Sequence, residues 1–221
     1  MKNEIKAYVF DVYGTLFDVH SVKRKADELY GGKGEEISRV WRQKQLEYSF
    51  LRQIMGNYET FLTVTRNALT YTLRSLQLES SPEYEELLIN EYNNLDCYPE
   101  TEKVLQKLSG KKLAVFSNGS HDMLNPLIEQ SGLAPLFDAV ISVDHAKQFK
   151  PSPASYTLVL KELGVERENV LFMSSNGWDI SGARNFGFQT AWINRGGMPA
   201  EELGLKPDSI YEDLNGILEW G

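Results

Sequence analysis

The feature that most constrains this chain is a short apolar run near its start that ends on an acidic residue and then turns. Such a run predicts a buried strand, which we place over Ile5 to Phe10. Asp11 follows at the carboxyl end of that strand, Gly14 lets the backbone turn, and Thr15 is close enough in sequence to hydrogen-bond the carboxylate. Because ligands bind at this edge of an open α/β sheet, Asp11 is a candidate functional residue as well as a candidate turn cap.

The second half of the chain alternates between strand and helix patterns from Cys97 onward. Near-continuous apolar strands separated by helices are typical of a parallel sheet covered on both faces. Together with the first run, the pattern gives at least five strands in an α/β fold. The predicted strands of this half are 112–116, 138–143, 170–173 and 190–193, and the predicted helices are 99–108, 122–131, 153–163 and 179–186.

Between the two parts lies a long segment, from Asp18 to Asn94, whose apolar residues recur at helical spacing without a convincing strand pattern. A proline at position 82 after a serine predicts the start of one more helix, and glycines at positions 31, 32 and 56 supply turns. We therefore expect an all-helical insertion. Its two predicted apolar faces are Ile37, Val40, Trp41, Tyr48 and Leu51, and Phe61, Leu62, Thr65, Leu69, Leu73 and Leu76.

Composition excludes several classes of protein. The formal net charge of −8 disfavours a nucleic acid or an anionic membrane surface as partner. Cys97 is the only cysteine, so an intrachain disulfide or a site with several cysteine ligands is impossible. No apolar run approaches the length of a membrane span, and the first residues lack the apolar core of a signal peptide, so we expect a cytoplasmic protein.

Polar residues follow the same end of successive predicted strands, which is harder to attribute to chance than a single such loop. Asp11 and Thr15 follow the first strand, and Ser117 and Asn118 follow the second, just before a helix whose first N–H groups favour an anion. The next loop supplies Lys150, a positive charge that suits an anionic substrate or a nucleophilic carboxylate. The last group comprises Ser174, Ser175, Asn176, Gly177, Trp178 and Asp179.

These motifs resemble those of the haloacid dehalogenase superfamily over essentially the full length of the chain. They read Asp-Val-Tyr-Gly-Thr-Leu from residue 11, Phe-Ser-Asn-Gly from residue 116, Lys-Pro-Ser-Pro from residue 150 and Ser-Ser-Asn-Gly-Trp-Asp from residue 174. The resemblance implies a Rossmann-like core with helices on both faces, interrupted after its first strand by a cap. We therefore expect the core at residues 1–16 and 96–221 and the helical cap at residues 17–95.

Two departures from the superfamily's phosphotransferases suggest which branch this is. Those enzymes hold Mg²⁺ with a second acid two residues after the nucleophile, where this chain has Tyr13, and with an acid where it has Ser174. We expect neither metal nor cofactor. The chain resembles the L-2-haloacid dehalogenases more closely, and Arg42 lies in a segment similar to the one that carries their essential arginine.

The resemblance implies displacement of halide from C2 of a short 2-haloalkanoate. Asp11 would attack C2 and form an ester with inversion, while Arg42 would stabilise the departing halide together with Asn118 and Phe61. Ser117 and the backbone at Asn118 would hold the substrate carboxylate, and Lys150 would keep Asp11 ionised.

In the second half of the implied reaction, water attacks the acyl carbon of the Asp11 ester. Asp179 would be the base, held by Asn176 and Lys150. Thr15, Ser174 and Tyr156 would support this arrangement, and Tyr156 also counts among the expected substrate contacts. An apolar wall that excludes bulk water would consist of Tyr13, Leu46, Phe61 and Trp178.

Several alternatives stay open. A phosphohydrolase could recruit a metal through Asp11 and Asp179, and a related hydrolase could open a small strained ring acid with the same residues. A binding or interaction protein that uses the same scaffold without catalysis would be expected to lack Asp11, Lys150 or Asp179, all of which are present. An α/β-hydrolase is excluded because Ser117 does not lie in a Gly-x-Ser-x-Gly elbow. The resemblance also implies a homodimer.

Overall fold

The computed structural model describes residues 4–220, and its centre is a six-stranded sheet in the order β5-β4-β1-β6-β7-β8. Every neighbouring pair in this sheet is parallel, which confirms the predicted α/β class. The strands are β1 (Ala7–Phe10), β4 (Lys112–Ser117), β5 (Ala139–Ser142), β6 (Val170–Ser174), β7 (Gln189–Ile193) and β8 (Ser209–Tyr211). All four residues of β1 are fully buried, as expected for the central strand of a covered sheet.

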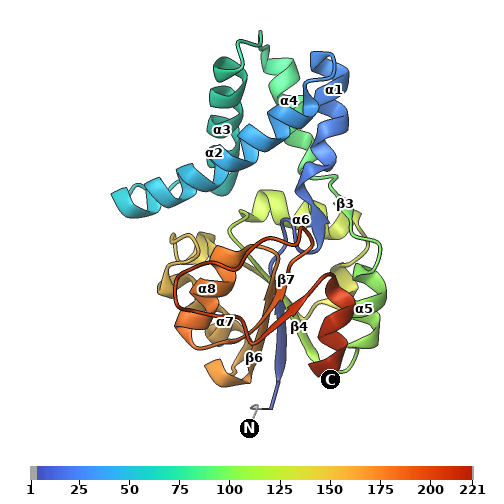
Figure 1. The fold of residues 1–221 in the computed structure, drawn as a ribbon, viewed down its shortest axis with the longest axis vertical. Coiled ribbons are helices and arrows are strands. Elements are labelled where there is room, and N and C mark those ends of the chain that lie inside the picture. Colours follow the sequence, from blue (N-terminus) through green and yellow to red (C-terminus); the bar gives the residue numbers. More distant parts are fainter. Residues whose placement is uncertain (1–3, 221) are drawn as a thin grey trace.

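Helices cover both sides of the sheet, with α7 and α8 on one side and α5 and the C-terminal 3₁₀ helix η5 on the other (Figure 1). Their bounds are α5 (Thr101–Lys107), α6 (His121–Gln130), α7 (Pro153–Leu163), α8 (Gly177–Phe186) and η5 (Leu214–Trp220). Shorter 3₁₀ turns are η2 (Ala134–Leu136), η3 (Val143–His145) and η4 (Arg167–Asn169). This arrangement is the Rossmann-like core that the resemblance implied.

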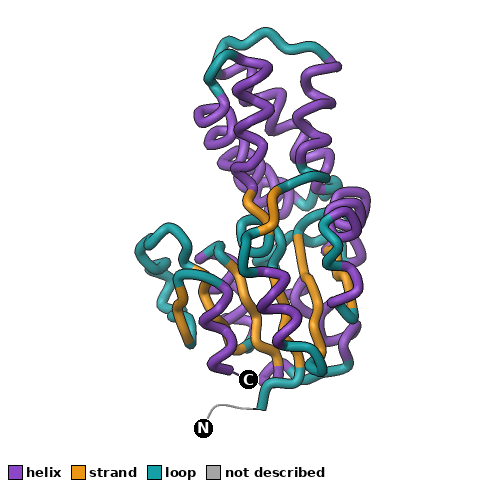
Figure 2. The backbone as a smooth tube through the Cα atoms, turned by 90° about the vertical axis from the view of Figure 1, so that its right-hand side faces the viewer, coloured by secondary structure: helices purple, strands orange, loops and turns teal. Residues whose placement is uncertain are grey.

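The inserted segment forms a separate group of helices above the carboxyl ends of the strands (Figures 1 and 2). It comprises η1 (Val19–Val22), α1 (Lys23–Tyr30), α2 (Gly34–Met55), α3 (Phe61–Ser75) and α4 (Pro82–Glu91). Two short antiparallel strands, β2 (Phe17–Asp18) and β3 (Asp96–Cys97), lie side by side where the chain leaves and rejoins the core. We refer to residues 17–95 as the helical unit.

Local sequence signals explain where these helices begin and end. The hydroxyls of Thr60 and Ser81 accept hydrogen bonds from backbone N–H groups at the starts of α3 and α4, and Pro82 is the first residue of α4. Gly31 and Gly56 end α1 and α2 in the left-handed conformation, with φ of 57° and 64°. The predicted turns at these glycines are confirmed.

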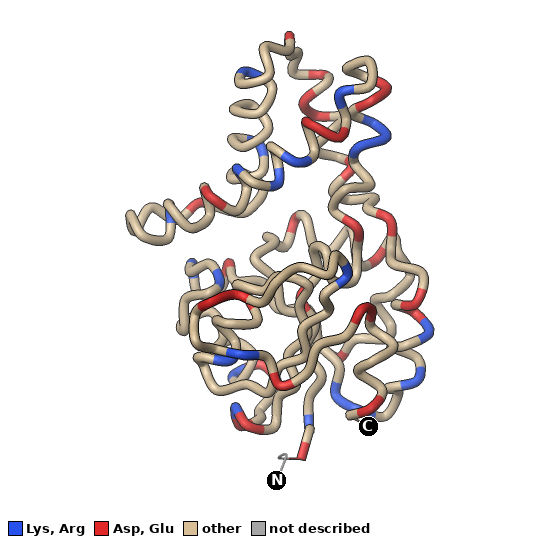
Figure 3. Tube along the Cα trace, in the orientation of Figure 1, with Lys and Arg blue, Asp and Glu red and all other residues tan. Residues whose placement is uncertain are grey.

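Charged residues of both signs are interspersed along the core and the helical unit (Figure 3). Some pair across elements: Arg66 on α3 lies 2.6 Å from Glu86 on α4, and Arg24 on α1 lies 2.7 Å from Asp96 on β3. Exposed pairs of this kind contribute only about 0–1 kcal/mol each, so the apolar face of the helices holds the unit together. Within residues 4–220, no helix combines the length and the hydropathy that crossing a bilayer would require.

Some predicted boundaries and faces were wrong. The predicted apolar face of α2 included Leu51, which is 44% exposed, because the buried face of the second half of α2 continues instead through the polar residues Gln45 and Ser49. Helix α8 begins at Gly177, two residues before the predicted start, and β1 begins at Ala7 rather than at residue 5. Strands β2, β3 and β8 were not predicted, since runs of two or three residues carry no readable alternation.

Candidate active site

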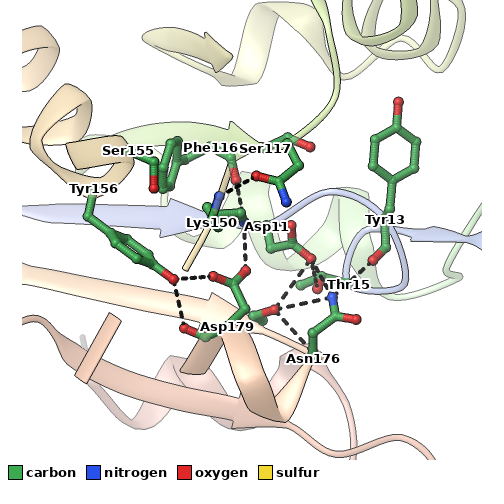
Figure 4. Close-up of polar contacts among 12 residues, drawn as sticks. Asp11, Tyr13, Thr15, Phe116, Ser117, Lys150, Ser155, Tyr156, Asn176 and Asp179 are labelled. Carbon is green, nitrogen blue, oxygen red and sulfur yellow. Dashed lines mark hydrogen bonds and ion pairs between the residues drawn. The ribbon is translucent and has the colours of Figure 1, made fainter. Parts of the chain in front are cut away.

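A buried lysine joins two aspartates at the carboxyl edge of the sheet (Figure 4). The Lys150 ammonium lies 2.9 Å from Oδ1 of Asp11 and 2.6 Å from Oδ2 of Asp179, and it also donates to the Phe116 carbonyl at 3.1 Å. All three charged side chains are at most 6% exposed. Burying one such charge alone would cost several kcal/mol, so the three groups stabilise one another and hold a fixed geometry.

The second carboxylate oxygen of Asp11 is held by uncharged donors from two strand ends. Oδ2 accepts hydrogen bonds from the Thr15 hydroxyl at 2.9 Å, from Nδ2 of Asn176 at 3.0 Å and from the Ser174 hydroxyl at 3.3 Å. The parallel register brings these groups together, because Phe10 at the end of β1 lies beside Met173 near the end of β6. Asp11 is thus oriented through both oxygens.

Lys150 reaches the cluster from the loop before α7. Its backbone N–H donates to Oδ1 of Asn118 at 2.7 Å, which links this loop to the loop after β4. Helix α8 supplies Asp179 from its first turn, where Ser174 accepts a hydrogen bond from the Asn176 N–H. Four separate strand ends therefore converge on one buried cluster.

Burial changes the protonation of this cluster in opposite ways for its members. Burial raises the pKa of Asp179 to about 6, and the neighbouring Lys150 charge works against that rise. Burial alone would lower the pKa of Lys150, but the charges of Asp11 and Asp179 raise it overall, so the ammonium stays protonated. The Tyr156 hydroxyl donates to Oδ1 of Asp179 at 2.7 Å, and burial raises the pKa of Tyr156 well above its usual range.

Two predicted contacts differ from what the structure shows. Asn176 was expected to hold Asp179, and its backbone carbonyl accepts a hydrogen bond from the Asp179 N–H at 3.0 Å. Its side-chain amide instead donates to Asp11 and to the Tyr13 carbonyl at 3.3 Å, because the side chain points back toward the first strand. Tyr156 was expected to contact substrate as well, but it is fully buried behind Asp179 and does not line the cavity described below. It supports Asp179, as predicted.

The predicted anion site at the start of α6 is already occupied by acidic side chains of the protein. The N–H of His121 donates to Asp144 at 3.3 Å, and Asp122 accepts from the Ser120 hydroxyl. Ser117 and Asn118, just before this helix, do face the cavity. The substrate carboxylate would therefore meet the loop rather than the helix end.

The helical unit contributes an arginine to the opposite side of the site. Arg42 on α2 donates to Oε1 of Gln45 at 2.7 Å and approaches Oδ1 of Asn176 at 3.5 Å. Gln45, which is fully buried, donates in turn to the Thr65 hydroxyl on α3 at 2.7 Å. Sequence reasoning missed Gln45; its signal was a polar residue four positions after Trp41 on the buried face of α2.

A small cavity of about 10 Å³ lies between the core cluster and the helical unit. This volume holds about one water molecule, so the space must widen to admit a substrate. Every predicted substrate contact except Tyr156 lines it. The lining residues are Asp11, Tyr13, Arg42, Leu46, Phe61, Ser117, Asn118, Lys150, Asn176 and Trp178.

A larger cavity of about 850 Å³, which we call the vestibule, lies beside the small one. It shares five lining residues with the small cavity, so these residues form the boundary between the two spaces. They are Tyr13, Arg42, Leu46, Asn176 and Trp178. The vestibule is also lined by His20, Tyr98 and Arg195, which sequence reasoning did not single out because they lie in no motif.

The residues present do not fit a magnesium ion. Mg²⁺ needs several oxygen ligands in an octahedral arrangement. Here the Lys150 ammonium occupies the space between Asp11 and Asp179, and the remaining contacts of Asp11 are hydrogen-bond donors. Within residues 4–220, no group of three or more His, Cys, Asp or Glu residues could hold a metal ion.

Fold and site together define an enzyme of the α/β class with a buried carboxylate cluster under an inserted helical unit. The chain belongs to the haloacid dehalogenase-like hydrolases, whose family pattern it matches over residues 5–187. It is 52% identical over 191 residues to an (S)-2-haloacid dehalogenase of Xanthobacter autotrophicus, covering 86% of this chain and 76% of that protein. It is 46% identical to haloacetate dehalogenase H-2 of Moraxella sp. (strain B), covering 97% of both chains.

Solved structures give the same result. An L-2-haloacid dehalogenase from Xanthobacter autotrophicus with chloropropionic acid covalently bound superposes with a TM-score of 0.91 at 45% identity, covering 97% of this chain and 96% of that one. The L-2-haloacid dehalogenase RSc1362 superposes with a TM-score of 0.96 at 41% identity, covering 99% of both chains.

Proposed function

We propose that this enzyme hydrolyses short (S)-2-haloalkanoic acids to the 2-hydroxy acid and halide, through an ester of Asp11 and with inversion at C2. One observation carries the proposal: the cation beside Asp11 is the fixed ammonium of Lys150, and Arg42 lines the same small cavity. A displacement at carbon requires an ionised carboxylate and a charge partner for the leaving group, and it requires no metal.

In the first half of the reaction, the Asp11 carboxylate forms a bond to C2 while the carbon–halogen bond breaks and its electron pair leaves with the halide. Lys150 keeps Asp11 ionised, and Thr15, Ser174 and Asn176 keep it oriented. Arg42 stabilises the halide, with Asn118 and Phe61 beside it in the cavity wall. Ser117 and the backbone at Asn118 hold the substrate carboxylate.

In the second half, water attacks the acyl carbon of the Asp11 ester and gives a proton to Asp179. The raised pKa of Asp179, about 6, suits a general base near neutral pH, and Tyr156 fixes its orientation through the 2.7 Å hydrogen bond. Lys150 contacts both carboxylates and so keeps the base beside the ester. The bond between the acyl carbon and the oxygen on C2 then breaks, and that oxygen takes the second proton of the water. Asp11 returns to its carboxylate, and the product carries the alkyl group of the substrate and a hydroxyl at C2.

A metal-dependent phosphohydrolase is less well supported, because Lys150 lies where the metal would have to bind between Asp11 and Asp179. A hydrolase that opens a small strained ring acid would use the same displacement, and only its substrate would differ. The deciding experiment measures chloride release from L-2-chloropropionate in EDTA beside a Mg²⁺-supplemented phosphomonoester assay. We expect chloride and D-lactate without metal; phosphate release that depends on Mg²⁺, without chloride, would contradict the proposal.

We also propose that residues 17–95 act as a cap over a core formed by residues 1–16 and 96–221. The paired strands β2 and β3 provide the two crossings, and Arg42, Leu46 and Phe61 reach the cavity from the cap side. Limited proteolysis with and without a 2-haloacid tests this division, since substrate should protect the β2 and β3 crossings. Equal cleavage of all loops would contradict it.

The enzyme is proposed to work as a homodimer through the cap. The far end of α2 exposes large apolar side chains: Leu51 is 44%, Ile54 82% and Met55 64% exposed. Apolar side chains grouped on one helix end favour association with another apolar surface. Sedimentation should give a dimer, and Ile54→Glu should give a monomer that still folds; a monomeric unaltered protein would contradict the proposal.

A further inference from the structure

The segment that delivers Lys150 to the catalytic cluster is held by a side chain of the cap. We call residues 143–150, which follow β5, the lysine segment. Gln53, near the end of α2, accepts a hydrogen bond from the backbone N–H of Phe149 at 2.7 Å, and its amide donates to Oε1 of Gln148 at 2.9 Å. Because these two residues immediately precede Lys150, the cap bonds to the chain right beside the lysine.

Tyr58, in the turn between α2 and α3, holds the same segment at a second point. Its hydroxyl donates to Oδ1 of Asp144, and its ring centre lies 5.0 Å from that of Phe149, which is fully buried. Burial raises the pKa of Tyr58 well above its usual range, and the hydrogen bond to Asp144 raises it further, so the hydroxyl stays protonated. The cap therefore contacts both the beginning and the end of the lysine segment.

The lysine segment connects these cap contacts to the loop after β4. The backbone N–H of Lys150 donates to Oδ1 of Asn118 at 2.7 Å, so two consecutive N–H groups bond to the cap and to this loop. Asp144 accepts the Tyr58 hydroxyl through one oxygen and the N–H of His121 through the other, at 3.3 Å. A displacement of the segment would therefore move the lysine and the loop together.

The contacts made by Gln53 and Tyr58 lie away from the two covalent connections between cap and core. Those connections are the paired strands β2 and β3, whereas α2 runs away from β3 across the top of the core (Figure 1). A cap held only at β2 and β3 could still tilt about them. Hydrogen bonds at the far end of α2 set its position over the lysine segment.

The backbone of the lysine segment needs support from outside. Lys147 has a φ of 50°, a left-handed conformation that costs free energy in a residue other than glycine. Such a conformation persists only where the surrounding structure holds it. Gln53 bonds to Gln148 and Phe149, the two residues that follow Lys147, so it lies where it can supply that support.

We propose that Gln53 and Tyr58 are positioning residues, which hold the lysine segment against the cap and so set where the Lys150 ammonium lies between the two catalytic carboxylates. The catalytic consequence of this inference rests on the proposed function. Neither residue lines the small cavity, so each acts through the segment rather than on substrate. The ammonium lies 2.9 Å from Asp11 and 2.6 Å from Asp179, and a shift of the segment would weaken these contacts.

The protonation of Asp179 reports the position of Lys150. Burial raises the pKa of Asp179 to about 6, the Lys150 charge lowers it, and the nearby Asp11 charge raises it. The Tyr156 hydroxyl, which donates to Asp179 from α7, also lowers it. A lysine that is held less firmly lowers this pKa less, so the pKa of Asp179 should rise when the cap contacts are removed. A role in stability alone would leave this pKa unchanged.

The test uses Gln53→Met and Tyr58→Phe, which remove the hydrogen-bonding groups at nearly the same side-chain volume. The matched controls are Gln43→Met and Tyr84→Phe, which make the same chemical changes at exposed positions of the cap. Gln53→Glu is the conservative variant, because its carboxylate can still accept the hydrogen bond from the Phe149 N–H.

Hydrogen exchange followed by mass spectrometry, without substrate, measures how firmly the lysine segment is held. We expect exchange in this segment to be about tenfold faster in Gln53→Met and Tyr58→Phe, as for the loss of one hydrogen bond. Exchange in β2 and β3 should not change, and both controls should match the unaltered protein. Unchanged exchange in the lysine segment of both test variants would overturn the inference.

The pKa of Asp179 is measured by NMR of its carboxyl carbon, whose signal is identified by its absence in Asp179→Asn. We expect the pKa to rise by roughly half a pH unit or more in Gln53→Met and to return toward its original value in Gln53→Glu. The pH at which kcat falls on the acid side should rise with it. Faster exchange with an unchanged pKa would overturn the inference, because the cap contacts would then serve stability alone.

These two measurements need no turnover, so they separate the inference from the proposed function. If the exchange and the titration behave as expected in an enzyme that releases no halide from any 2-haloacid, the proposed function fails and the positioning of Lys150 by the cap stands.

Discussion

The two sides of the active site are built in different ways. On the core side, Asp11, Lys150 and Asp179 are buried, and their oxygens and nitrogen are held by contacts of 2.6 to 3.3 Å from four strand ends. On the cap side, Arg42 donates to Gln45 from its own helix, and its hydrogen bond to Asn176 of the core is 3.5 Å long. In the proposed mechanism the core therefore carries the covalent chemistry in a fixed geometry, and the cap completes the site through a longer contact.

This difference separates what each side can determine. A preorganised core fixes the reaction, because the nucleophile and base need no rearrangement when substrate arrives. In the proposed mechanism the cap contributes Arg42, Leu46 and Phe61, which meet the halide and the alkyl group together with core residues, so the cap should help to determine which substrate is accepted. Substitutions on the core side should therefore have larger effects, and they should lower stability as well as turnover.

The largest effect is expected for Lys150→Met. Without the ammonium, Asp11 and Asp179 face each other as buried carboxylates, so protonation replaces the ionised nucleophile. We expect kcat to fall at least roughly thousandfold and stability to fall by about 3–5 kcal/mol. Halide-release kinetics and urea unfolding measure the two losses.

Lys161→Met, an exposed lysine on α7, is the control for Lys150→Met and should change neither quantity. If Lys150→Met kept a tenth or more of the activity, the core would not be the preorganised side of the site.

The next effect is expected for Arg42→Ala on the cap side. Removing the charge partner of the halide should lower kcat about 10²–10³-fold. Stability should stay within about 0.5 kcal/mol, because the side chain is half-buried and has no acidic partner among residues 4–220. Exposed Arg39 on the same helix provides the control, Arg39→Ala, which should retain full activity. If Arg42→Ala lowered stability as much as Lys150→Met, the two sides of the site would not differ as described.

The pH dependence of turnover sharpens the comparison. Burial raises the pKa of Asp179 to about 6, so at lower pH this carboxyl binds a proton and can no longer accept one from water. Activity should therefore be lost on the acid side, by about tenfold per pH unit below that value. Steady-state rates measured across pH follow this loss of activity on the acid side. Release of halide in the first turnover, which comes from the displacement by Asp11, should still occur at pH 5. A kcat that stays level down to about pH 5 would show that Asp179 is not the base.

The smallest of these effects is expected for Gln45→Leu. Gln45 connects Arg42 to the Thr65 hydroxyl, so its loss frees the guanidinium without removing the charge. We expect kcat to fall by roughly tenfold with little change in KM, since the guanidinium acts on the departing halide. Gln43→Leu, at an exposed position of the same helix, is the matched control. A change in KM alone would assign Gln45 to substrate binding rather than to the orientation of Arg42.

The core could be predicted from the sequence much better than the cap. Asp11, Lys150 and Asp179 lie in compact motifs at strand ends, and long apolar strands such as β4 and β6 can be recognised from their runs of apolar residues. The burial of Gln45 and the exposure of Leu51 could not be predicted, because both depend on which face of α2 packs against α3. That face carries polar residues, so the apolar pattern of the sequence does not identify it. The contact of Asn176 with Asp11 likewise depends on a side-chain direction that sequence spacing does not define.

The most direct test of the central claim is a single turnover of L-2-chloropropionate in water that carries the heavy oxygen isotope, with enzyme in excess. If Asp11 forms an ester and water attacks its acyl carbon, the heavy oxygen enters the Asp11 carboxylate first. Mass spectrometry of the peptide that contains Asp11 should therefore show one heavy oxygen, and the released D-lactate should show none. Heavy oxygen in the lactate, with an unlabelled Asp11, would mean that water attacks C2 directly, and it would contradict the role assigned to Asp11.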